Sequence, residues 1–395
     1  MLCIRVPVHA GFLTRIQSSM RITAGASATS PNNLFHRQRA WLSTSTAAMA
    51  TMKALVYAAK GQPRLEDRSK PTILKPTDAI VKMVKTTICG TDLHIFKGDV
   101  ATCDTGRILG HEGVAVVEQI GDNVCLFKPG DKVIVSCITS CTTCANCRRG
   151  MPSHCTNGGW ALGNTIDGTQ AEYTRIPHAD GSLHLAVESA SDNAQLMLSD
   201  TVPTGYECGV LQGKIKLGST VAIVGSGPVG LGALITSQLY SPLQIIMIDL
   251  NEKRLATARS LGATHTVVSG PNVVEQVMKI TGGRGVDAAL EAVGIPATFE
   301  LCQKLVAVGG TIANLGVHGT KVDLHLETLW DKNITITTRL VDASSTPMLI
   351  KLVESGKILP EKFATHTFAF KDIEKAYSIF GAAEAHDCLK VVIEF

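Results

Sequence analysis

The stretch TVAIVGSGPVG at residues 220–230 restricts the fold more than any other feature of this 395-residue chain. A run of apolar and β-branched residues predicts a buried strand that leads into a glycine-rich turn, and a helical stretch follows to about residue 240. A second predicted strand, IIMID at 245–249, ends in Asp249. A strand, a G-x-G-x-x-G turn, a helix and a second strand with a terminal carboxylate together indicate a dinucleotide-binding unit.

Each glycine of this motif has its own physical role. Gly225 permits the tight turn, Gly227 lets the backbone approach a pyrophosphate over the helix N-terminus, and Gly230 allows close helix–strand packing. Asp249 is placed to bind the adenosine ribose hydroxyls and would repel a 2′-phosphate, which favours NAD over NADP. Arg254 either lines the adenosine pocket and tolerates some NADP, or is a solvated helix residue.

The rest of the chain predicts two domains of different character. Strand-like and helical segments alternate over residues 204–340, which predicts a doubly wound parallel sheet. Before it, from Met52 onward, short valine-rich segments bounded by Gly, Pro and Asp indicate a β-rich, partly open barrel. After Leu340, two helices and one strand are expected to return to that first domain. The predicted fold class is therefore α/β.

The first 50 residues differ in composition from the remainder. They hold five arginines, no lysine and no acidic residue, and the first acid is Glu66. This composition predicts a mitochondrial presequence over residues 1–48 and a matrix location. The alternative is a cytoplasmic protein translated from Met49 or Met52.

The net charge and the hydropathy exclude some classes of partner. Without the first 50 residues, Lys+Arg falls from 37 to 32 against 34 acids, which gives a net charge of −2. This near-neutral charge gives no electrostatic reason to expect nucleic acid or an acidic membrane surface as a partner. No apolar run approaches the roughly 20 residues that a membrane-spanning helix needs.

Two short motifs in the β-rich part carry metal-binding chemistry. CGTDLH begins with Cys89, and GHEG contains His111 and Glu112. A thiolate and an imidazole are natural zinc ligands. Each alone would more simply be a buried thiol or a core histidine, but Asp92 and His94 beside them favour a reactive cluster. Asp92 is suited to orient a ligand from behind.

A cysteine cluster, CITSCTTCANCRRGMPSHC, occupies residues 137–155. Four of its cysteines have the C-x2-C-x2-C spacing followed by one more: Cys141, Cys144, Cys147 and Cys155. Four thiolates on one loop suit a closed tetrahedral zinc, which would be structural because no coordination position stays open. A metal-free loop and an iron–sulfur cluster are the alternatives. Cys137 lies outside this spacing and is interpreted as a small buried residue.

Taken together, these motifs resemble the zinc-dependent medium-chain alcohol dehydrogenases, over essentially everything after residue 51. The resemblance is strongest to the short-chain and secondary alcohol dehydrogenase subgroup. It implies a GroES-like catalytic domain (52–203 and 341–395) with a structural zinc lobe at 137–155, and a Rossmann NAD-binding domain (204–340). It also implies two zinc ions per chain and a homo-oligomer, a tetramer or dimer formed through the nucleotide domain.

The resemblance assigns a role to each matching metal-site residue. Cys89 and His111 match two ligands of the catalytic zinc. Asp200 falls where many relatives have a cysteine ligand, and aspartate takes this place in the secondary-alcohol subgroup. Carboxylate oxygen also binds zinc, so the set remains chemically sound. Glu112 matches a carboxylate that approaches the metal from its open side.

Other matching positions surround the expected reaction centre. Thr91 and His94 match the hydroxyl and the imidazole that pass the substrate proton towards solvent. Thr204 and Val229 match positions that support the nicotinamide ring. Trp160 matches a substrate-pocket tryptophan of the secondary-alcohol subgroup, although an ordinary core or surface aromatic is the alternative.

The resemblance therefore implies an enzyme that interconverts small primary or secondary alcohols and the corresponding aldehydes or ketones with NAD(H). A polyol or threonine-type zinc dehydrogenase is the alternative within the same class, because those enzymes share similar motifs. A zinc-ribbon protein that binds nucleic acid is a remote alternative, since the cysteine loop offers only Arg148 and Arg149 and no aromatic platform. A relative without catalysis is disfavoured by the complete set of Cys89, His111 and Asp200.

Overall fold

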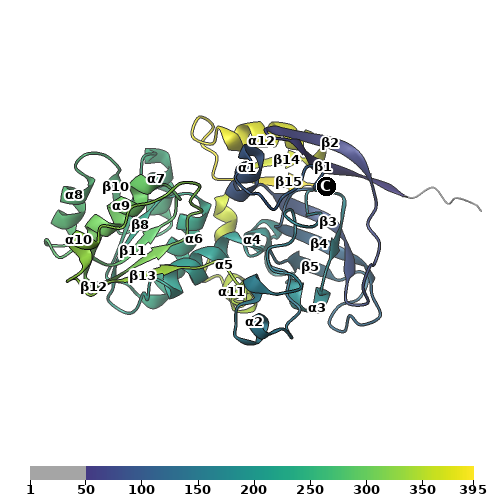
Figure 1. Ribbon diagram of the computed structural model, residues 1–395, viewed down its shortest axis with the longest axis horizontal. Helices are drawn as coiled ribbons and strands as arrows, with labels where there is room; N and C mark the ends of the chain where they lie inside the picture. The colour runs from purple at the N-terminus through teal and green to yellow at the C-terminus, as the bar shows by residue number, and fades with distance from the viewer. Residues whose placement is uncertain (1–49) are drawn as a thin grey trace, which may run out of the picture. The chain divides into compact units, whose positions relative to one another are not determined.

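The computed structural model describes residues 50–395. The mitochondrial presequence predicted for residues 1–48 lies outside the described residues. Within residues 50–395, no helix is both long enough and apolar enough to cross a membrane. The described residues form a six-stranded, a seven-stranded and a two-stranded sheet. Figure 1 shows the six-stranded sheet, on the left, apart from the other two and with helices of its own.

A six-stranded sheet in the order β10-β9-β8-β11-β12-β13 forms the centre of the nucleotide-binding half. All of its neighbouring strands are parallel, which confirms the predicted doubly wound sheet. The strands are β8 (Thr220–Val224), β9 (Gln244–Asp249), β10 (His265–Val268), β11 (Val286–Glu291), β12 (Val306–Asn314) and β13 (Thr335–Thr338). The helices are α6 (Pro228–Ser237), α7 (Glu252–Ser260), α8 (Val273–Ile280), α9 (Pro296–Leu305) and α10 (Leu326–Leu329).

Strand β8 explains why this sheet is covered on both faces. Val221 and Ile223 belong to one hydrophobic cluster, together with Leu231 and Leu234 of α6. Ala222 and its neighbour Val224 belong to a second cluster on the opposite face. Successive side chains of a strand point to opposite faces, so a strand that is apolar at every position needs a hydrophobic layer on each side.

The other half contains a seven-stranded sheet in the order β14-β15-β3-β4-β5-β7, with β6 paired to β3. A two-stranded hairpin, β1 and β2, accompanies it, which confirms the β-rich prediction. The strands are β1 (Thr51–Ala59), β2 (Gln62–Ser69), β3 (Ala79–Thr87), β4 (Gly113–Ile120), β5 (Lys132–Val135), β6 (Tyr173–Ile176), β7 (Leu183–Leu185), β14 (Ala364–Ala369) and β15 (Lys390–Glu394).

The two ends of the described chain meet in this second sheet. β15 pairs antiparallel with β3 and parallel with β14, so purple and yellow ribbons lie side by side in Figure 1. The sequence predicts two helices and one strand after residue 340, and the structure contains α11 (Thr346–Glu354), α12 (Ile373–Gly381) and β15. Strand β14 is an addition that the sequence pattern did not predict, because its residues alternate only between half-buried and exposed.

A short helical segment connects the two halves and carries a candidate ligand. Helix α5 (Thr201–Thr204) follows Asp200 directly and continues into a π-helical segment, η2 (Gly205–Leu211). A Cβ on Gly205 would lie 2.4 Å from the backbone nitrogen of Ala233 in α6. Only glycine allows this approach, so the segment after Asp200 is packed closely against the nucleotide-binding half.

Candidate active site

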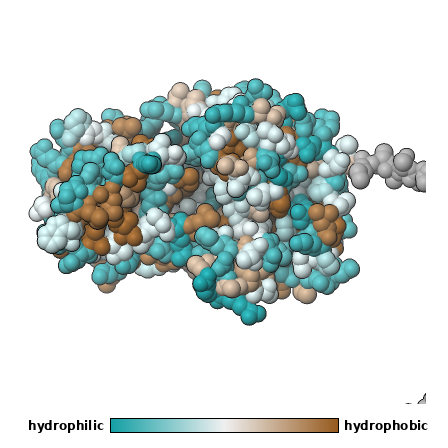
Figure 2. Space-filling view, in the orientation of Figure 1, coloured by the Kyte–Doolittle hydropathy of each residue, from teal (hydrophilic) through white to brown (hydrophobic). Residues whose placement is uncertain are grey.

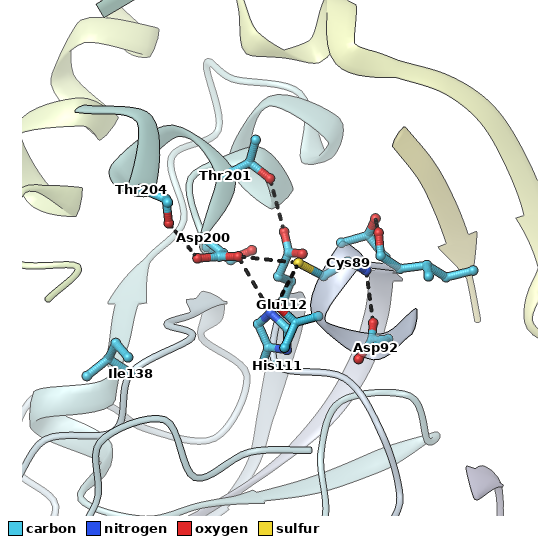
Figure 3. A network of polar contacts seen from close by, with 12 residues as sticks. Cys89, Asp92, His111, Glu112, Ile138, Asp200, Thr201 and Thr204 are labelled. Atoms are coloured by element: carbon cyan, nitrogen blue, oxygen red, sulfur yellow. Dashed lines mark hydrogen bonds and ion pairs between the residues drawn. The ribbon is translucent and has the colours of Figure 1, made fainter. Parts of the chain in front are cut away.

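Three predicted metal ligands from distant parts of the chain converge at one point (Figure 3). Cys89 is the N-cap of helix α1 (Gly90–Lys97), His111 precedes strand β4, and Asp200 precedes helix α5. Asp200 Oδ2 lies 3.5 Å from His111 Nε2 and 3.9 Å from Cys89 Sγ. Thiolate, imidazole and carboxylate donors therefore face one another across a space of a few ångströms.

These separations fit a zinc ion. Around a tetrahedral zinc with bonds of about 2.1–2.3 Å, the donor atoms lie about 3.4–3.8 Å apart. One ligand atom each from Cys89, His111, Glu112 and Asp200 lies within 4.8 Å of every other. The donor types and the spacing thus suit the metal that the sequence predicts.

The charge state of Asp200 is set by its neighbours. Burial is the largest single influence and acts to raise the pKa of this carboxyl group. The hydrogen bond and charge of His111, with the Lys390 charge and the Thr204 hydrogen bond, together outweigh burial and place the pKa well below its usual range. Thr204 Oγ1 donates a second hydrogen bond to Asp200 Oδ1 at 2.8 Å. Asp200 is therefore an anion with one oxygen turned towards Cys89 and His111 and the other fixed by Thr204.

Cys89 is held in place from behind by a buried polar network. Asp92 Oδ2 accepts a hydrogen bond from the Cys89 backbone nitrogen at 2.9 Å and another from Gln170 Nε2 at 3.3 Å. Tyr377 donates its hydroxyl to Gln170 Oε1 at 2.8 Å. The structure thus places Asp92 where the sequence predicts a supporting carboxylate. Gln170 and Tyr377 are additional supports with no signal in the sequence.

Glu112 is turned towards a cation that the sequence analysis did not identify. Its Oε1 lies 2.6 Å from Lys390 Nζ, and both side chains are almost fully buried. The Glu112 carboxylate raises the pKa of Lys390 above its ordinary value, against the opposing effect of burial. The second oxygen of Glu112 accepts a longer hydrogen bond from Thr201 at 3.4 Å. Glu112 is therefore adjacent to the three other donors but has its own charge partner.

The converging donors open onto a cavity of about 570 Å³. The sequence-predicted residues that line it are Cys89, Thr91, His94, His111, Trp160, Asp200, Thr204 and Val229. Thr91 Oγ1 lies 3.6 Å from Cys89 Sγ, and the Trp160 ring meets the His111 ring edge-on at 6.3 Å. His94 Nδ1 lies 3.0 Å from Asp99 Oδ2. The structure thus brings the predicted relay and pocket residues to the candidate metal ligands.

Further residues line this cavity without having been predicted. Cys137 was interpreted as a small buried residue, and it is indeed buried, but it also lines the cavity. Burial first, and then the Asp200 charge, raise the pKa of this thiol well above its usual value, so it is neutral. The segment 314–317 at the end of strand β12 also lines the cavity. Neither feature has the ligand spacing or motif that would reveal it in a sequence.

The glycine turn has the geometry expected of a dinucleotide site. Gly225 has a φ of +107°, and a Cβ on Gly230 would lie 2.0 Å from the Gly225 carbonyl oxygen. Both positions therefore require glycine for reasons internal to the protein. In contrast, a Cβ on Gly227, the N-cap of α6, would meet no protein atom within 4 Å. That open space leaves room for a ligand to approach the backbone, so the turn fits a bound dinucleotide.

A second cavity, of about 510 Å³, extends from this turn. Gly225, Gly227, Asp249 and Arg254 line it, so four of the predicted cofactor residues lie together. Asp249 Oδ2 accepts a hydrogen bond from the Ser226 backbone nitrogen at 2.6 Å, and Oδ1 accepts one from Asn251 at 2.9 Å. Asp249 therefore holds the glycine turn in place while its carboxylate borders the cavity.

The cysteine cluster forms a separate group of donors. The four sulfur atoms of Cys141, Cys144, Cys147 and Cys155 lie within 4.8 Å of one another. The Cys144 and Cys147 sulfur atoms are 3.5 Å apart, close to the edge of about 3.8 Å expected between thiolates on a tetrahedral zinc. The backbone N–H of Cys147 contributes most to lowering the pKa of the Cys144 thiol, to about 5, which makes it a thiolate at neutral pH. The four sulfur atoms therefore suit a metal ion. None of these four cysteines lines the 570 Å³ cavity.

Comparison with known proteins places the chain in a family. Residues 75–186 match the alcohol dehydrogenase GroES-like domain, and residues 228–355 match the zinc-binding dehydrogenase family. An alcohol dehydrogenase from Cupriavidus necator is 36% identical over 369 residues, covering 87% of this chain and 99% of that protein. An NADP-dependent isopropanol dehydrogenase from Thermoanaerobacter brockii is 34% identical over 355 residues, again covering 87% of this chain and 99% of that protein.

Solved structures agree with this placement. The apo form of zinc dependent alcohol dehydrogenase 2 from Streptococcus pneumonia has 54% sequence identity and a TM-score of 0.84, and the match covers 87% of this chain and 98% of that one. The chain therefore belongs to the zinc-type alcohol dehydrogenases of the medium-chain dehydrogenase/reductase superfamily. It is an oxidoreductase that uses zinc and a nicotinamide cofactor. The resemblance, the two-part α/β fold and the enzyme class predicted from the sequence are confirmed.

Proposed function

We propose that the chain oxidises small secondary and primary alcohols, and reduces the corresponding carbonyls, with Cys89, His111 and Asp200 as the ligands of the catalytic zinc. The observation that carries the proposal is the convergence of these three donors at one wall of the 570 Å³ cavity. The relative named an isopropanol dehydrogenase supports a small secondary alcohol as the substrate class. Trp160 packs against His111 and limits the space beside the donors.

The chemistry divides between the bound groups and the chain. Zinc in this position would supply a Lewis acid that lowers the pKa of an alcohol, and the nicotinamide would accept the hydride. Thr91 is placed beside Cys89 to receive the hydroxyl proton of the substrate. His94, whose side chain is 28% exposed and whose Nδ1 lies 3.0 Å from Asp99 Oδ2, is placed to carry this proton towards solvent.

The residues around the donors have positioning roles. Thr204 holds one Asp200 oxygen, so that the other points at Cys89 and His111. Val229 borders the same cavity from the first turn of helix α6, which is the side where the glycine turn would deliver the nicotinamide. A preorganised set of this kind needs no rearrangement of the ligands during turnover.

We infer that NAD is the preferred cofactor. The adenosine end of the cofactor would lie in the cavity of about 510 Å³ beside the glycine turn, called the adenosine cavity below. Asp249 ends strand β9 at the edge of this cavity, and its negative charge would repel the 2′-phosphate of NADP. The Thermoanaerobacter relative is named for NADP, so the preference of this chain rests on its own residues.

We propose a second zinc held by Cys141, Cys144, Cys147 and Cys155. Four thiol donors fill a tetrahedral ion completely, so this metal would stabilise the lobe at 137–155 and take no part in the reaction. The expected content is two zinc ions per chain.

We also propose a homo-oligomer and a mitochondrial location. Strand β13 is an edge of the six-stranded sheet, and Figure 2 shows hydrophobic surface over the region that β12 and β13 occupy in Figure 1. Trp330 and Val308 are 78% and 74% exposed, as an interface would require. Light scattering should give the mass of a dimer or a tetramer.

The proposed mitochondrial location rests on the composition of residues 1–48 alone, and import into isolated mitochondria would test it.

The proposed function is tested by turnover of an alcohol panel followed through NADH absorbance. We expect 2-propanol and 2-butanol to be oxidised, acetone to be reduced, and NAD to exceed NADP in kcat/KM. The Asp200→Asn variant is the matched inactive control. A strong preference for sorbitol or threonine would replace the proposal with a polyol or amino-alcohol dehydrogenase.

A further inference from the structure

The adenosine cavity is bordered by a residue from the other half of the protein. Most residues that line it belong to the segment between strand β8 and helix α9, among them Asp249 and Arg254. Glu384, however, lies on the loop that connects helix α12 to strand β15 in the catalytic half. The catalytic half thus contributes a carboxylate to the pocket in which the adenosine end of the cofactor would lie.

Two contacts hold this loop against the nucleotide-binding half. Lys253 Nζ lies 2.6 Å from Asp387 Oδ2, and Arg254 Nη2 donates to the Cys388 carbonyl oxygen at 3.4 Å. Lys253 and Arg254 are both in the first turn of helix α7, directly after strand β9 and Asp249. The loop is therefore attached beside the ribose end of the cavity, and Glu384 is carried into the cavity wall by this attachment.

The charges around the cavity are unbalanced. Asp249 and Glu384 are two carboxylates, whereas Arg254 is the cation on the same lining. Arg254 is also engaged by Cys388 of the loop, which draws its guanidinium towards the protein wall. A 2′-phosphate carries about −1.5 to −2 charges at neutral pH, so each nearby carboxylate opposes its entry. NAD has two hydroxyls at this ribose and meets no such repulsion.

We propose that Glu384 is a specificity-determining residue: with Asp249, it disfavours a 2′-phosphate in the adenosine cavity and so selects NAD over NADP. The inference rests on the proposed use of NAD and assigns part of that preference to the catalytic half. Because Glu384 is exposed to solvent, its effect is moderate and screened by salt. For a charge of this kind a change of about fivefold in the ratio of affinities is expected.

The test compares binding of two cofactor fragments by calorimetry, so that it does not depend on turnover. The probes are adenosine 5′-monophosphate and adenosine 2′,5′-bisphosphate, which differ by the 2′-phosphate. In Glu384→Gln, the affinity for the bisphosphate relative to the monophosphate should rise about fivefold at low salt, and the rise should shrink at 0.5 M salt. The ratio of kcat/KM for NADP to that for NAD should rise in parallel.

Asp372→Asn is the matched control, because it removes the same charge from an exposed residue at the start of helix α12, outside the cavity lining, and leaves the two contacts that hold the loop intact. Its affinity ratio should stay within about twofold of the wild-type ratio. The inference is overturned if Glu384→Gln leaves the ratio unchanged, or if Asp372→Asn shifts it equally. If the wild-type protein binds neither fragment, the proposed cofactor site is overturned as well. Failure of the cofactor site is thus distinguishable from failure of the role assigned to Glu384.

Discussion

Lys390 and Glu112 form a buried ion pair directly beside the candidate metal ligands. Glu112 is adjacent to His111 in a recognisable motif, but Lys390 is 278 residues away, at the start of a strand whose next three residues are apolar. Buried charges are tolerated only when they are paired and hydrogen-bonded. The pair therefore joins the last strand of the chain to the metal site, in addition to the backbone pairing of β15 with β3.

Replacing Lys390 alone should destabilise the fold. Lys390→Met leaves the Glu112 carboxylate buried without its partner, and we expect the free energy of unfolding to fall by about 3–5 kcal/mol. The double variant Lys390→Met/Glu112→Gln should recover most of this loss, because no buried charge remains. Denaturant titration of the metal-loaded protein measures both. Equal losses in the single and double variants would contradict the pairing argument.

Asp200 should be essential for the catalytic metal. In Asp200→Asn one of the two anionic donors is lost, so the zinc content should fall from about two to about one per chain. Because zinc contributes several kcal/mol to the transition state, kcat/KM should fall on the order of a thousandfold. Asp200→Cys supplies a thiolate ligand and should therefore keep the catalytic zinc. Elemental analysis is the measurement, and an Asp200→Asn protein with both zincs and full activity would rule Asp200 out as a ligand.

At the residue scale, the sequence predicts the site residues that stand in short motifs. It misses the residues that reach the site only because distant segments fold together. Cys89 and His111 stand in short motifs, and Asp200 could be proposed because a family resemblance marks its position. Lys390 and Gln170 have no such marker: each contributes through a partner distant in the chain. Their roles depend on pairings of strands and helices that no local pattern encodes.

The cysteine lobe is an element that has little apolar support of its own. Helix α2 (Ala145–Arg148), between Cys144 and Arg149, has no buried residue. A small lobe of this kind depends on its metal for stability. Cys144→Ser should therefore remove one zinc and lower the Tm by about 5 °C or more, while the catalytic zinc stays bound. Tm from calorimetry and metal content are measured together; a Cys144→Ser protein with two zincs would contradict the assignment.

Strand β7 contains a histidine that should make stability depend on pH. Burial lowers the pKa of His184 to about 4, from an ordinary value near 6.5. Between these values the unfolded chain binds a proton that the folded protein does not, so His184 reduces stability as the pH falls from 6.5 to 4. This loss of stability is absent well above pH 6.5 and is complete below about pH 4.

His184→Gln should flatten this loss relative to the wild type, measured as Tm against pH. The exposed His386→Gln is the control and should follow the wild-type curve. The argument fails if His184→Gln loses as much stability as the wild type between pH 6.5 and 4.

Elements differ in how well the sequence predicts them for a clear physical reason. Strands β8 and β9 are buried on both faces, so their apolar runs are unmistakable. Strands β2 and β14 have no fully buried position and few apolar residues, so neither has an apolar pattern that distinguishes it from a loop. The π-helical turns of η2 depend on packing against α6, which also lies outside any local pattern.

At the scale of the whole molecule, the reaction centre lies where the two halves of the fold meet. Cys89 and His111 come from the catalytic half, and the segment 314–317 comes from the nucleotide-binding half. The alternation of segments predicts the parallel sheet, but the return of β14 and β15 to β3 is a contact between segments about 280 residues or more apart in the chain. The cavity therefore forms only when both halves are folded. For this reason the sequence predicts the metal ligands at the cavity better than the other residues that line it.

The central claim is that one metal site is open to the cavity and reactive, and the other is closed and structural. Anomalous diffraction at the zinc edge from crystals of the purified protein tests it most directly. We predict two peaks per chain: one among Cys89, His111 and Asp200 at the cavity wall, and one enclosed by Cys141, Cys144, Cys147 and Cys155. A single peak in the cysteine cluster, with active protein in the same crystals, would contradict the account.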